Sequence, residues 1–301
     1  MNVMLAMVAA FFWGTTYAVT QYSLDGWPPL LLGAIRSLPA GLLLLAIKPN
    51  LPKRKSWPVL IRLGSLNIAL FFSLLFVMAQ TLPSAISGVG MISVPVFAMF
   101  FYWVFYQIRP TKVQILSGAL LVLLSWLLFD PRNLTLNPLG LIAMVAAISC
   151  IVVGSNITKT LGKELHWWSV LCWQLIIGGI VLTVAASTQA MLYPSQYIAA
   201  WNNFSLLNGL GLLWLILLNT VLAYTLYVWL LSRMSVVEFT FGGISNPIAG
   251  ILMGLLLVNE TFSTYQYTLM AFMILTSLLS PLIGAYSNRK KPSPSLTEVI
   301  K

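Results

Sequence analysis

Long apolar stretches separated by short polar ones run through the whole chain. Each stretch is close to 20 residues long, and an α-helix of that length crosses the roughly 30 Å hydrocarbon core of a bilayer at about 1.5 Å per residue. A membrane β-barrel would instead show alternating segments of about ten residues. We therefore predict an all-α membrane protein with ten transmembrane helices. Their residue ranges are 3–21, 30–48, 62–81, 84–106, 111–129, 137–159, 168–189, 208–231, 236–258 and 263–287.

The apolar pattern contains a repeat. Residues 62–129 overlay residues 214–281 without a gap, at an offset of 152 (214 minus 62). In this overlay Asn67 falls on Asn219, and the motif GMISVP falls on GGISNP. The offset at the start of each half is 137, as the two copies of AMVAA show, and the extra residues fall in a predicted loop near 190–206. Matches of residue types that are rare in apolar helices predict two related units.

The predicted units contain five helices each, which is an odd number of crossings. The units are residues 1–133 and 134–288, followed by a basic cytoplasmic tail at 289–301. The second unit therefore enters the membrane from the opposite side, and the two form an inverted repeat, as in many secondary transporters. Substrates of such proteins bind near the middle of the membrane between the halves, and rocking of one half against the other gives alternating access.

Charged residues make up only 7% of the 301 residues, against roughly 25% in a soluble domain. Of the 16 Lys and Arg residues, Arg36 lies inside a predicted helix, and with the N-terminus in the cytoplasm only Arg132 lies outside. The remaining 14 (16 minus 2) lie on the cytoplasmic side, as the positive-inside rule requires. We therefore expect both termini in the cytoplasm, and we attribute the net charge of +10 to membrane orientation rather than to binding of nucleic acid.

Four motifs give the chain a resemblance to a known family. They are FFWGTTYAVTQ in the first predicted helix, IRSLPAGLLLL in the second, SGVGMISVPVFAMFF in the fourth and GGISNPIAGILMGLLLVNE in the ninth. Over nearly its whole length the chain resembles the drug/metabolite transporter superfamily, specifically its EamA-type ten-helix members. The opening motifs are most similar to the branch that includes pigment and metabolite exporters.

The resemblance implies export or exchange of small metabolites across a bacterial inner membrane without ATP. It also implies that the fifth and tenth helices are peripheral, whereas the other eight surround a central cavity. One position departs from the family pattern. The family usually repeats the Glu that ends LLLVNE in both halves, whereas here Glu260 is matched by Ile108, so a symmetric pair of acids is missing.

Arg36 is the only charged residue well inside a predicted helix. A charge at that depth costs several kcal/mol unless it is paired or hydrated. In one interpretation it faces the cavity and binds a substrate carboxylate through two parallel hydrogen bonds. In the other it extends outward and pairs with Asp25, Glu260 or lipid headgroups. The family resemblance slightly favours the cavity.

Further candidates for binding a substrate are aromatic and uncharged polar residues inside predicted helices. Aromatic rings supply flat walls for a planar solute, and the polar groups hydrogen-bond either a solute or a neighbouring helix. Core packing and contacts between helices are the competing interpretation for each. Together with Arg36, the predicted substrate-binding residues are Trp13, Thr16, Tyr17, Asn67, Ser93, Trp173, Gln174, Asn219, Tyr224, Ser245 and Asn246.

Pro95 and Pro247 stand near the middle of the fourth and ninth predicted helices, at matching positions of the repeat. Proline has no N–H, so each is expected to free the carbonyl four residues earlier, at Met91 and Gly243. We predict that the two prolines are hinges. The alternative is a pair of static kinks whose free carbonyls are satisfied by neighbouring helices.

Titratable groups that could carry a proton are scarce. Glu238 and Glu260 bracket the ninth predicted helix and are the candidate proton carriers, with ordinary helix-end charges as the alternative. No cluster of metal ligands and no phosphate-binding glycine loop is present in the sequence. We expect neither a metal nor a cofactor, and we do not expect an enzyme.

The sequence therefore predicts an integral multi-pass protein of the bacterial inner membrane that transports without ATP. Its expected cargo is a small amphipathic metabolite, such as an amino acid or an aromatic carboxylate, which it exports or exchanges by alternating access. A lipid flippase and a metabolite uptake facilitator are the alternatives on the same fold. The expected partners are a small-molecule substrate and membrane lipids, and the residues do not identify any protein partner.

Overall fold

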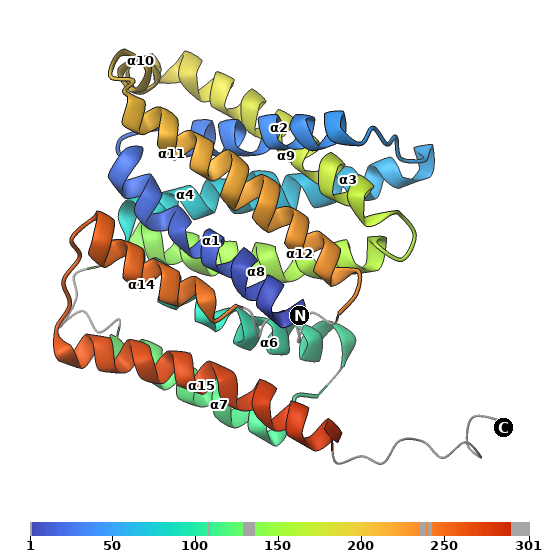
Figure 1. Cartoon of the computed structure of the whole chain (residues 1–301), viewed down its shortest axis with the longest axis vertical. Helices are drawn as coiled ribbons and strands as arrows, with labels where there is room; N and C mark the ends of the chain where they lie inside the picture. Colours follow the sequence, from blue (N-terminus) through green and yellow to red (C-terminus); the bar gives the residue numbers. More distant parts are fainter. Residues whose placement is uncertain (1, 108, 129–135, 235–238, 240–242, 290–301) are drawn as a thin grey trace.

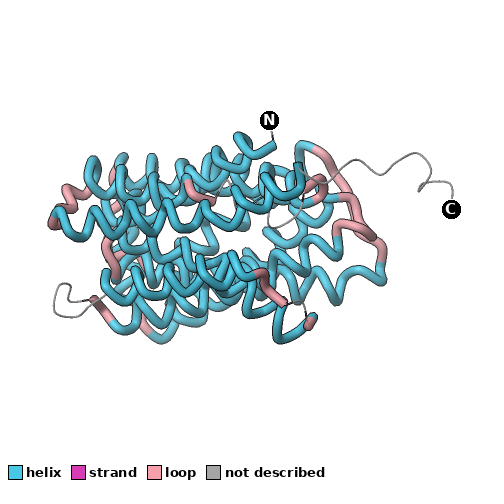
Figure 2. Tube along the Cα trace, turned by 90° about the horizontal axis from the view of Figure 1, so that it is seen from below, coloured by secondary structure: helices cyan, strands magenta, loops and turns pink. Residues whose placement is uncertain are grey.

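The computed structural model shows a bundle of helices that lie side by side (Figure 1). Every regular element among the described residues is helical. Seen at right angles to the first view, the helices form more than one layer (Figure 2). The structure describes residues 2–107, 109–128, 136–234, 239 and 243–289, with the backbone alone described at 106 and 280–289.

The first predicted half contains long α-helices, some of which are interrupted by a short 3₁₀ or π-helical turn. Their bounds are α1 Asn2–Ser23, α2 Pro29–Ile47, η1 Arg54–Ser56, α3 Trp57–Leu63, η2 Gly64–Leu70, α4 Phe71–Thr81, α5 Ser84–Gly90, η3 Met91–Ser93, α6 Val94–Tyr106 and α7 Lys112–Leu128.

The second predicted half also contains a π-helix, and it has a short helix, α10, directly after α9. Its helices are α8 Pro138–Leu161, α9 Trp167–Leu192, α10 Pro194–Asn202, α11 Leu206–Ile216, η4 Leu217–Leu222, α12 Ala223–Leu231, α14 Ser245–Leu257 and α15 Thr264–Arg289.

Seven helical segments in the described part of the chain are long and apolar enough to cross a membrane, and α7 and α14 are shorter apolar helices. The predicted helix ends agree with the structure within a few residues at most positions, because apolar length follows bilayer thickness. The total of ten crossings and the cytoplasmic position of both termini stay predictions.

The segment near 190–206, which we expected to be a loop, is largely helical. α9 runs on to Leu192, and α10 follows it directly with Pro194 in its first turn, where a missing N–H carries no cost. Only Tyr197 and Ala200 of α10 are buried. A short helix with so few apolar contacts leaves no periodic signal that a sequence pattern would show.

Helices from the two predicted halves pack directly against each other. α1 packs against α14 and α12, α2 against α9, and α5 against α14. α7 and α15 lie side by side at one edge of the molecule, and α10 lies at the opposite edge (Figure 1). This is the peripheral position that the family resemblance implies for the fifth and tenth helices.

Glycines allow the closest of these approaches. A Cβ added at Gly14 of α1 would lie 2.2 Å from the carbonyl oxygen of Asn246 on α14. On the other side of α14, Gly88 and Gly250 face each other, and a Cβ on Gly88 would lie 3.2 Å from the Cα of Gly250. α14 is therefore held between α1 and α5 at nearly backbone-to-backbone distance, as small residues permit in membranes.

Candidate substrate-binding site

Arg36 of α2 is the most deeply buried charge among the described residues, with 1% of its surface exposed. Its Nε donates to Thr220 Oγ1 at 2.8 Å, and its Nη2 donates to the main-chain carbonyl of Asn219 at 3.2 Å. The guanidinium carbon lies 4.3 Å from the centre of the Phe72 ring, which is a cation–π distance. The side chain thus points at η4 in the other predicted half and does not extend toward the outer surface.

The guanidinium is only partly satisfied. Nη1 of Arg36 is buried and has no hydrogen-bond partner in the described part of the chain. None of the contacts to the other two nitrogens involves a carboxylate. A buried cation with a free N–H face and no counter-charge among the described residues can donate hydrogen bonds to an anion.

Asn219 connects three helices at the centre of the site. Its carbonyl oxygen accepts from Nε1 of Trp13, at 3.1 Å, as well as from Arg36, and its side-chain Nδ2 donates to Thr16 Oγ1 at 2.6 Å. Asn219 lies in the π-helix η4, at whose end the Ala223 N–H donates to Leu218 and Thr220 and not to Asn219. π-helical turns are rare and are often found at functional sites.

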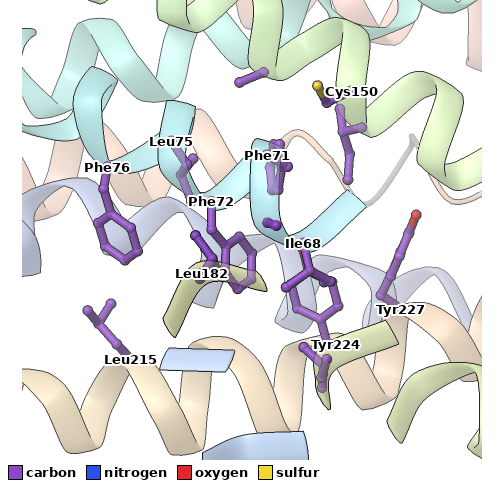
Figure 3. Packing of buried hydrophobic residues seen from close by; sticks show 14 of the residues in the cluster. Ile68, Phe71, Phe72, Leu75, Phe76, Cys150, Leu182, Leu215, Tyr224 and Tyr227 are labelled. Atoms are coloured by element: carbon purple, nitrogen blue, oxygen red, sulfur yellow. The ribbon is translucent and has the colours of Figure 1, made fainter. Parts of the chain in front are cut away.

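Aromatic rings close the space beside Arg36. The Tyr224 ring centre lies 5.6 Å from that of Phe72 and 5.1 Å from that of Trp13. Figure 3 shows Phe72 and Tyr224 meeting between the two predicted halves, with Tyr227 one turn further along α12. The hydroxyl of Tyr224 is fully buried and has no partner among the described residues. It is a second unsatisfied polar group near Arg36.

A similar polar pair lies at the matching position of the first half. Asn67 is on η2, which is also π-helical, and the Phe71 N–H bypasses its carbonyl just as Ala223 bypasses that of Asn219. Asn67 Nδ2 donates to Gln174 Oε1 of α9 at 3.0 Å. Both residues are fully buried, while Asn67 Oδ1 and Gln174 Nε2 have no partner in the described structure.

Other predicted site residues lie next to this centre. The Tyr17 hydroxyl donates to Asn246 Oδ1 at 3.4 Å, which joins α1 to the start of α14. Ser245 and Asn246 are both buried in the first turn of α14. The structure therefore brings Trp13, Thr16, Tyr17, Arg36, Asn219, Tyr224 and Asn246 together between the predicted halves.

Two predicted site residues lie elsewhere. Trp173 of α9 donates from Nε1 to the carbonyl of Asn50 at 2.7 Å, and its ring packs 4.7 Å from that of Trp57. It thus anchors the segment between α2 and α3 and does not face Arg36. Ser93 is half-buried in the short turn η3 and has no contact with the Arg36 group.

Sequence analysis missed three polar residues of the site. Thr220 binds Arg36 and also donates to the carbonyl of Leu215. Thr15 accepts from Trp214 Nε1 at 2.9 Å, and the Tyr227 hydroxyl lies 2.6 Å from Ser155 Oγ. Thr15 and Thr220 are each next in sequence to a residue that was predicted to bind substrate. This proximity in sequence was the only feature from which they could have been predicted.

Pro95 lies in the first turn of α6 and not in the middle of a continuous helix. The 3₁₀ turn η3 precedes it, and there the Val94 N–H donates to the carbonyl of Met91. The prediction that Pro95 leaves this carbonyl free is wrong, because the tighter hydrogen bond of a 3₁₀ turn satisfies it.

The same arrangement recurs at Pro247, the third residue of α14. The Asn246 N–H donates to the carbonyl of Gly243 at 3.0 Å, so this carbonyl is not free either. Each proline therefore begins a helix directly after a tight turn. The hinge role of both prolines stays a prediction.

Glu260 closes one end of the site. Its carboxylate accepts from the main-chain N–H groups of Ser84 and Ala85 in the first turn of α5. A carboxylate is stabilised there by the helix dipole and the unpaired N–H groups. Gln21 of α1 reinforces this end by accepting from Ser84 Oγ and donating to the carbonyl of Leu82. Proton transport by Glu260 stays a prediction, and Glu238 lies outside the described residues.

A separate groove of about 280 Å³ opens between α2, α9 and α10. Apolar side chains such as Leu31, Ile35 and Leu38 line it on the α2 side, and Tyr197 of α10 borders it. Arg36 does not line this groove. The groove and the polar centre are therefore two different features of α2.

Comparisons with known proteins agree with this architecture. A family model described as "EamA-like transporter family" matches residues 1–129 and 138–281. Protein PecM of Dickeya dadantii is 29% identical over 294 residues, which cover 96% of this chain and 95% of that protein. The "Uncharacterized inner membrane transporter YedA" of Escherichia coli is 28% identical, over 93% of this chain and 90% of that protein.

A solved structure titled "Crystal structure of protein" has the same fold. It aligns with a TM-score of 0.67 at 15% sequence identity and covers 94% of this chain and 96% of its own. The resemblance that the motifs indicated is confirmed by the family match, and so is the prediction of an integral multi-pass membrane protein whose described elements are helices.

Proposed function

The chain belongs to the EamA-like transporter family, and we propose that it is a secondary transporter of a small organic anion. The cargo is an amphipathic metabolite such as an amino acid or an aromatic carboxylate, exported or exchanged across a bacterial inner membrane by alternating access. The name of one relative, which calls it an inner membrane transporter, supports transport.

One observation carries the proposal, namely the unsatisfied face of Arg36. Burial of an arginine without a counter-charge costs several kcal/mol, which a fold tolerates where the charge has a function. A substrate carboxylate can accept from the free Nη1 and from a second guanidinium N–H, which is the geometry of a two-point arginine–carboxylate pair. The unpartnered Tyr224 hydroxyl offers a further donor.

The matching features of the two halves support a two-unit transporter. Asn67 and Asn219 both lie on π-helical turns, and Pro95 and Pro247 both begin a helix after a tight turn. These pairs differ by the same offset of 152 (219 minus 67, and 247 minus 95). We propose that residues 1–133 and 134–288 are inverted five-helix repeats, with ten crossings in total and both termini in the cytoplasm.

The polar centre is closed to solvent in this conformation. Arg36, Asn219 and Tyr224 are at most 1% exposed, so a substrate reaches them only after the halves separate. The end closed by Glu260 is the end where α1 and α14 finish and α5 begins. Alternating access in the proposed sense is the opening of this end and of the opposite end in turn.

The experiment is a binding and transport comparison of Arg36→Met with a matched control. Arg62→Met removes an exposed arginine on α3, whereas Arg36 is buried. Purified proteins are tested for thermal stabilisation by amino acids, aromatic acids, nucleobases, cationic drugs and lysolipids, since a ligand of the folded state raises the Tm. Carboxylates found this way are then tested for uptake into proteoliposomes.

Stabilisation by carboxylates that survives Arg62→Met and is lost in Arg36→Met supports the proposal. Stabilisation by lysolipids alone supports the lipid flippase instead, with the groove beside α2 as its entry. Carboxylate transport that is the same in both variants contradicts the role of Arg36.

A further inference from the structure

The pair formed by Asn67 and Gln174 is hydrogen-bonded through only half of its polar atoms. One bond joins Asn67 Nδ2 to Gln174 Oε1, while the other oxygen and the other nitrogen have no partner in the described part of the chain. Both side chains are 0% exposed. An unsatisfied buried polar atom destabilises the folded state by about 1–3 kcal/mol. The pair contains two such atoms.

The two unsatisfied atoms are one acceptor and one donor, whichever way the amides are oriented. The oxygen and nitrogen of a side-chain amide are nearly the same size, and their assignment follows the hydrogen bonds. If both amides are turned by 180°, Gln174 donates to Asn67 instead. The free atoms then become a donor on Asn67 and an acceptor on Gln174, so the pattern is unchanged.

This pattern selects among ligand groups. A carboxylate satisfies the free donor but repels the free acceptor, and an ammonium group does the reverse. A group with a C=O beside an N–H on one planar edge satisfies both at once. Lactams, pyrimidinones and primary carboxamides have such an edge.

The polar pair is within reach of a molecule held at Arg36. Phe72, whose ring lies over the Arg36 guanidinium, is five residues beyond Asn67 on the same helix. Because η2 is π-helical, its rise per residue is smaller than the 1.5 Å of an α-helix, so five residues span at most about 7.5 Å along the axis, the length of a small ring with a carboxylate. Ile68 and Phe72 lie near Tyr224 in the same apolar cluster (Figure 3), with the Phe72 and Tyr224 ring centres 5.6 Å apart. These side chains form apolar walls for a flat ring.

We infer that the substrate carries a planar amide edge in addition to its carboxylate, and that Asn67 and Gln174 bind this edge. The inference rests on the proposed function, and it narrows the cargo to carboxylates of lactam-like or pyrimidinone-like rings and to carboxylates with a primary amide. Since both side chains are enclosed, the edge binds in a conformation in which the site has opened. α8 is in contact at this point, because a Cβ on Gly154 would lie 2.1 Å from Asn67 Oδ1.

The test compares three probes on purified full-length protein. Uracil-6-carboxylate has the carboxylate and the amide edge, benzoate has only the carboxylate, and uracil has only the edge. We expect wild type to bind uracil-6-carboxylate at least about tenfold more tightly than benzoate, since one or two added hydrogen bonds in a buried site are worth about that factor. Arg36→Met is expected to lose both carboxylates.

The decisive variant is the double substitution Asn67→Leu with Gln174→Met. It removes both amides together, so that no partner is left unsatisfied, and such replacements are nearly neutral or stabilising. We expect the Tm without ligand to stay level or rise, and the preference for uracil-6-carboxylate over benzoate to disappear. Gln174→Glu, which keeps shape and removes the donor, is expected to lose the same preference.

Several results would overturn the inference. Equal wild-type affinity for benzoate and uracil-6-carboxylate, with both lost in Arg36→Met, leaves the proposed function standing and rejects the amide edge. A lower Tm in the double variant together with an unchanged preference shows that the amides are structural. Absence of Arg36-dependent binding of either carboxylate rejects the proposed function and, with it, this inference.

Discussion

Nη2 of Arg36 donates to the main-chain carbonyl of Asn219 across 3.2 Å. This carbonyl lies in the π-helix η4, where the Ala223 N–H donates to Leu218 and Thr220 and not to Asn219. η2 has the same winding at Asn67, but there Gln174 supplies the polar contact. At the offset of 137, Arg36 corresponds to Trp173 (36 plus 137), so the charge exists in one half only. We therefore expect a substrate anion to bind in one orientation.

The first prediction concerns the shape of the cation at position 36. Arg36→Met is expected to reduce carboxylate transport about 100-fold, because a charge-assisted two-point contact is worth about 2–3 kcal/mol. Arg36→Lys keeps the charge but loses the planar fork, so we expect a loss of about tenfold. Initial uptake rates in proteoliposomes, normalised to inserted protein, measure both.

Folding should survive these changes. Thr220 still donates to the carbonyl of Leu215, and the Asn219 carbonyl still accepts from Trp13, so neither partner of Arg36 is left without a hydrogen bond. A lysine variant as inactive as the methionine variant would show that the fork, and not the charge, is essential. Full activity of Arg36→Met would remove Arg36 from the site.

The sequence pointed to most of this centre because its residues are unusual in apolar helices. Arg36, Asn219 and Trp13 are a charge, an amide and an indole inside long apolar runs, and each makes a contact between helices. The helix ranges could also be predicted directly from the sequence, since bilayer thickness fixes the length of a transmembrane helix. Thr15 and Thr220 were missed because threonine is common in membrane helices, where it usually bonds its own helix.

Two features could not be predicted from the sequence pattern, because they depend on backbone and side-chain geometry. A π-helical turn changes the register of hydrogen bonds without changing composition, so η2 and η4 left no trace except the matched asparagines. Trp173 was assigned to the interior because it is the sixth residue of the predicted helix 168–189 and not at its end. Helical side chains lean toward the N-terminus of their helix, and the indole reaches back to Asn50.

The second prediction is that Glu260 holds the two halves together at one end of the site. Its carboxylate accepts from Ser84 and Ala85, so removal of the acceptor should make this end open more often. We expect about tenfold faster labelling of a cysteine at Ser87 in Glu260→Ala than in wild type, with Glu260→Gln between them because its amide oxygen still accepts. Ser87 is a suitable reporter because it is fully buried and its hydroxyl has no partner among the described residues.

The labelling reagent is a membrane-impermeant maleimide added from outside, on a background in which both buried native cysteines, Cys150 and Cys172, are replaced by alanine. Equal labelling rates in wild type and Glu260→Ala would show that the contact with α5 does not hold this end closed. Labelling of Ser87→Cys only from the cytoplasmic side would reverse the proposed orientation.

The third prediction concerns the close approach of α1 and α14. In Gly14→Ala the new Cβ would lie 2.2 Å from the Asn246 carbonyl oxygen and 2.8 Å from the Ala249 Cβ. Since backbone atoms cannot turn aside, the helices must separate, at a cost of about 1–3 kcal/mol. We expect a Tm lowered by several degrees and slower transport. Gly209→Ala on α11 is the matched control, because its Cβ makes only an ordinary 3.4 Å contact with Phe204; a drop of the same size there would contradict the steric explanation.

The fourth prediction asks whether the prolines move. An alanine at Pro95 or Pro247 restores an N–H four residues after Met91 or Gly243. That N–H competes for the carbonyl now held by the 3₁₀ turn, so η3 and the turn before α14 can extend into continuous α-helix.

If the turns work as hinges, straightening them should slow the conformational step more than it weakens binding. We expect the double variant Pro95→Ala with Pro247→Ala to turn over about tenfold more slowly while its Kd for a carboxylate changes less than about twofold. Pro138→Ala is the control, since Pro138 stands at the first position of α8, where a helix has no internal use for the N–H. A double variant with normal turnover would make both prolines packing residues, because the proposed motion would then proceed without the turns that they maintain.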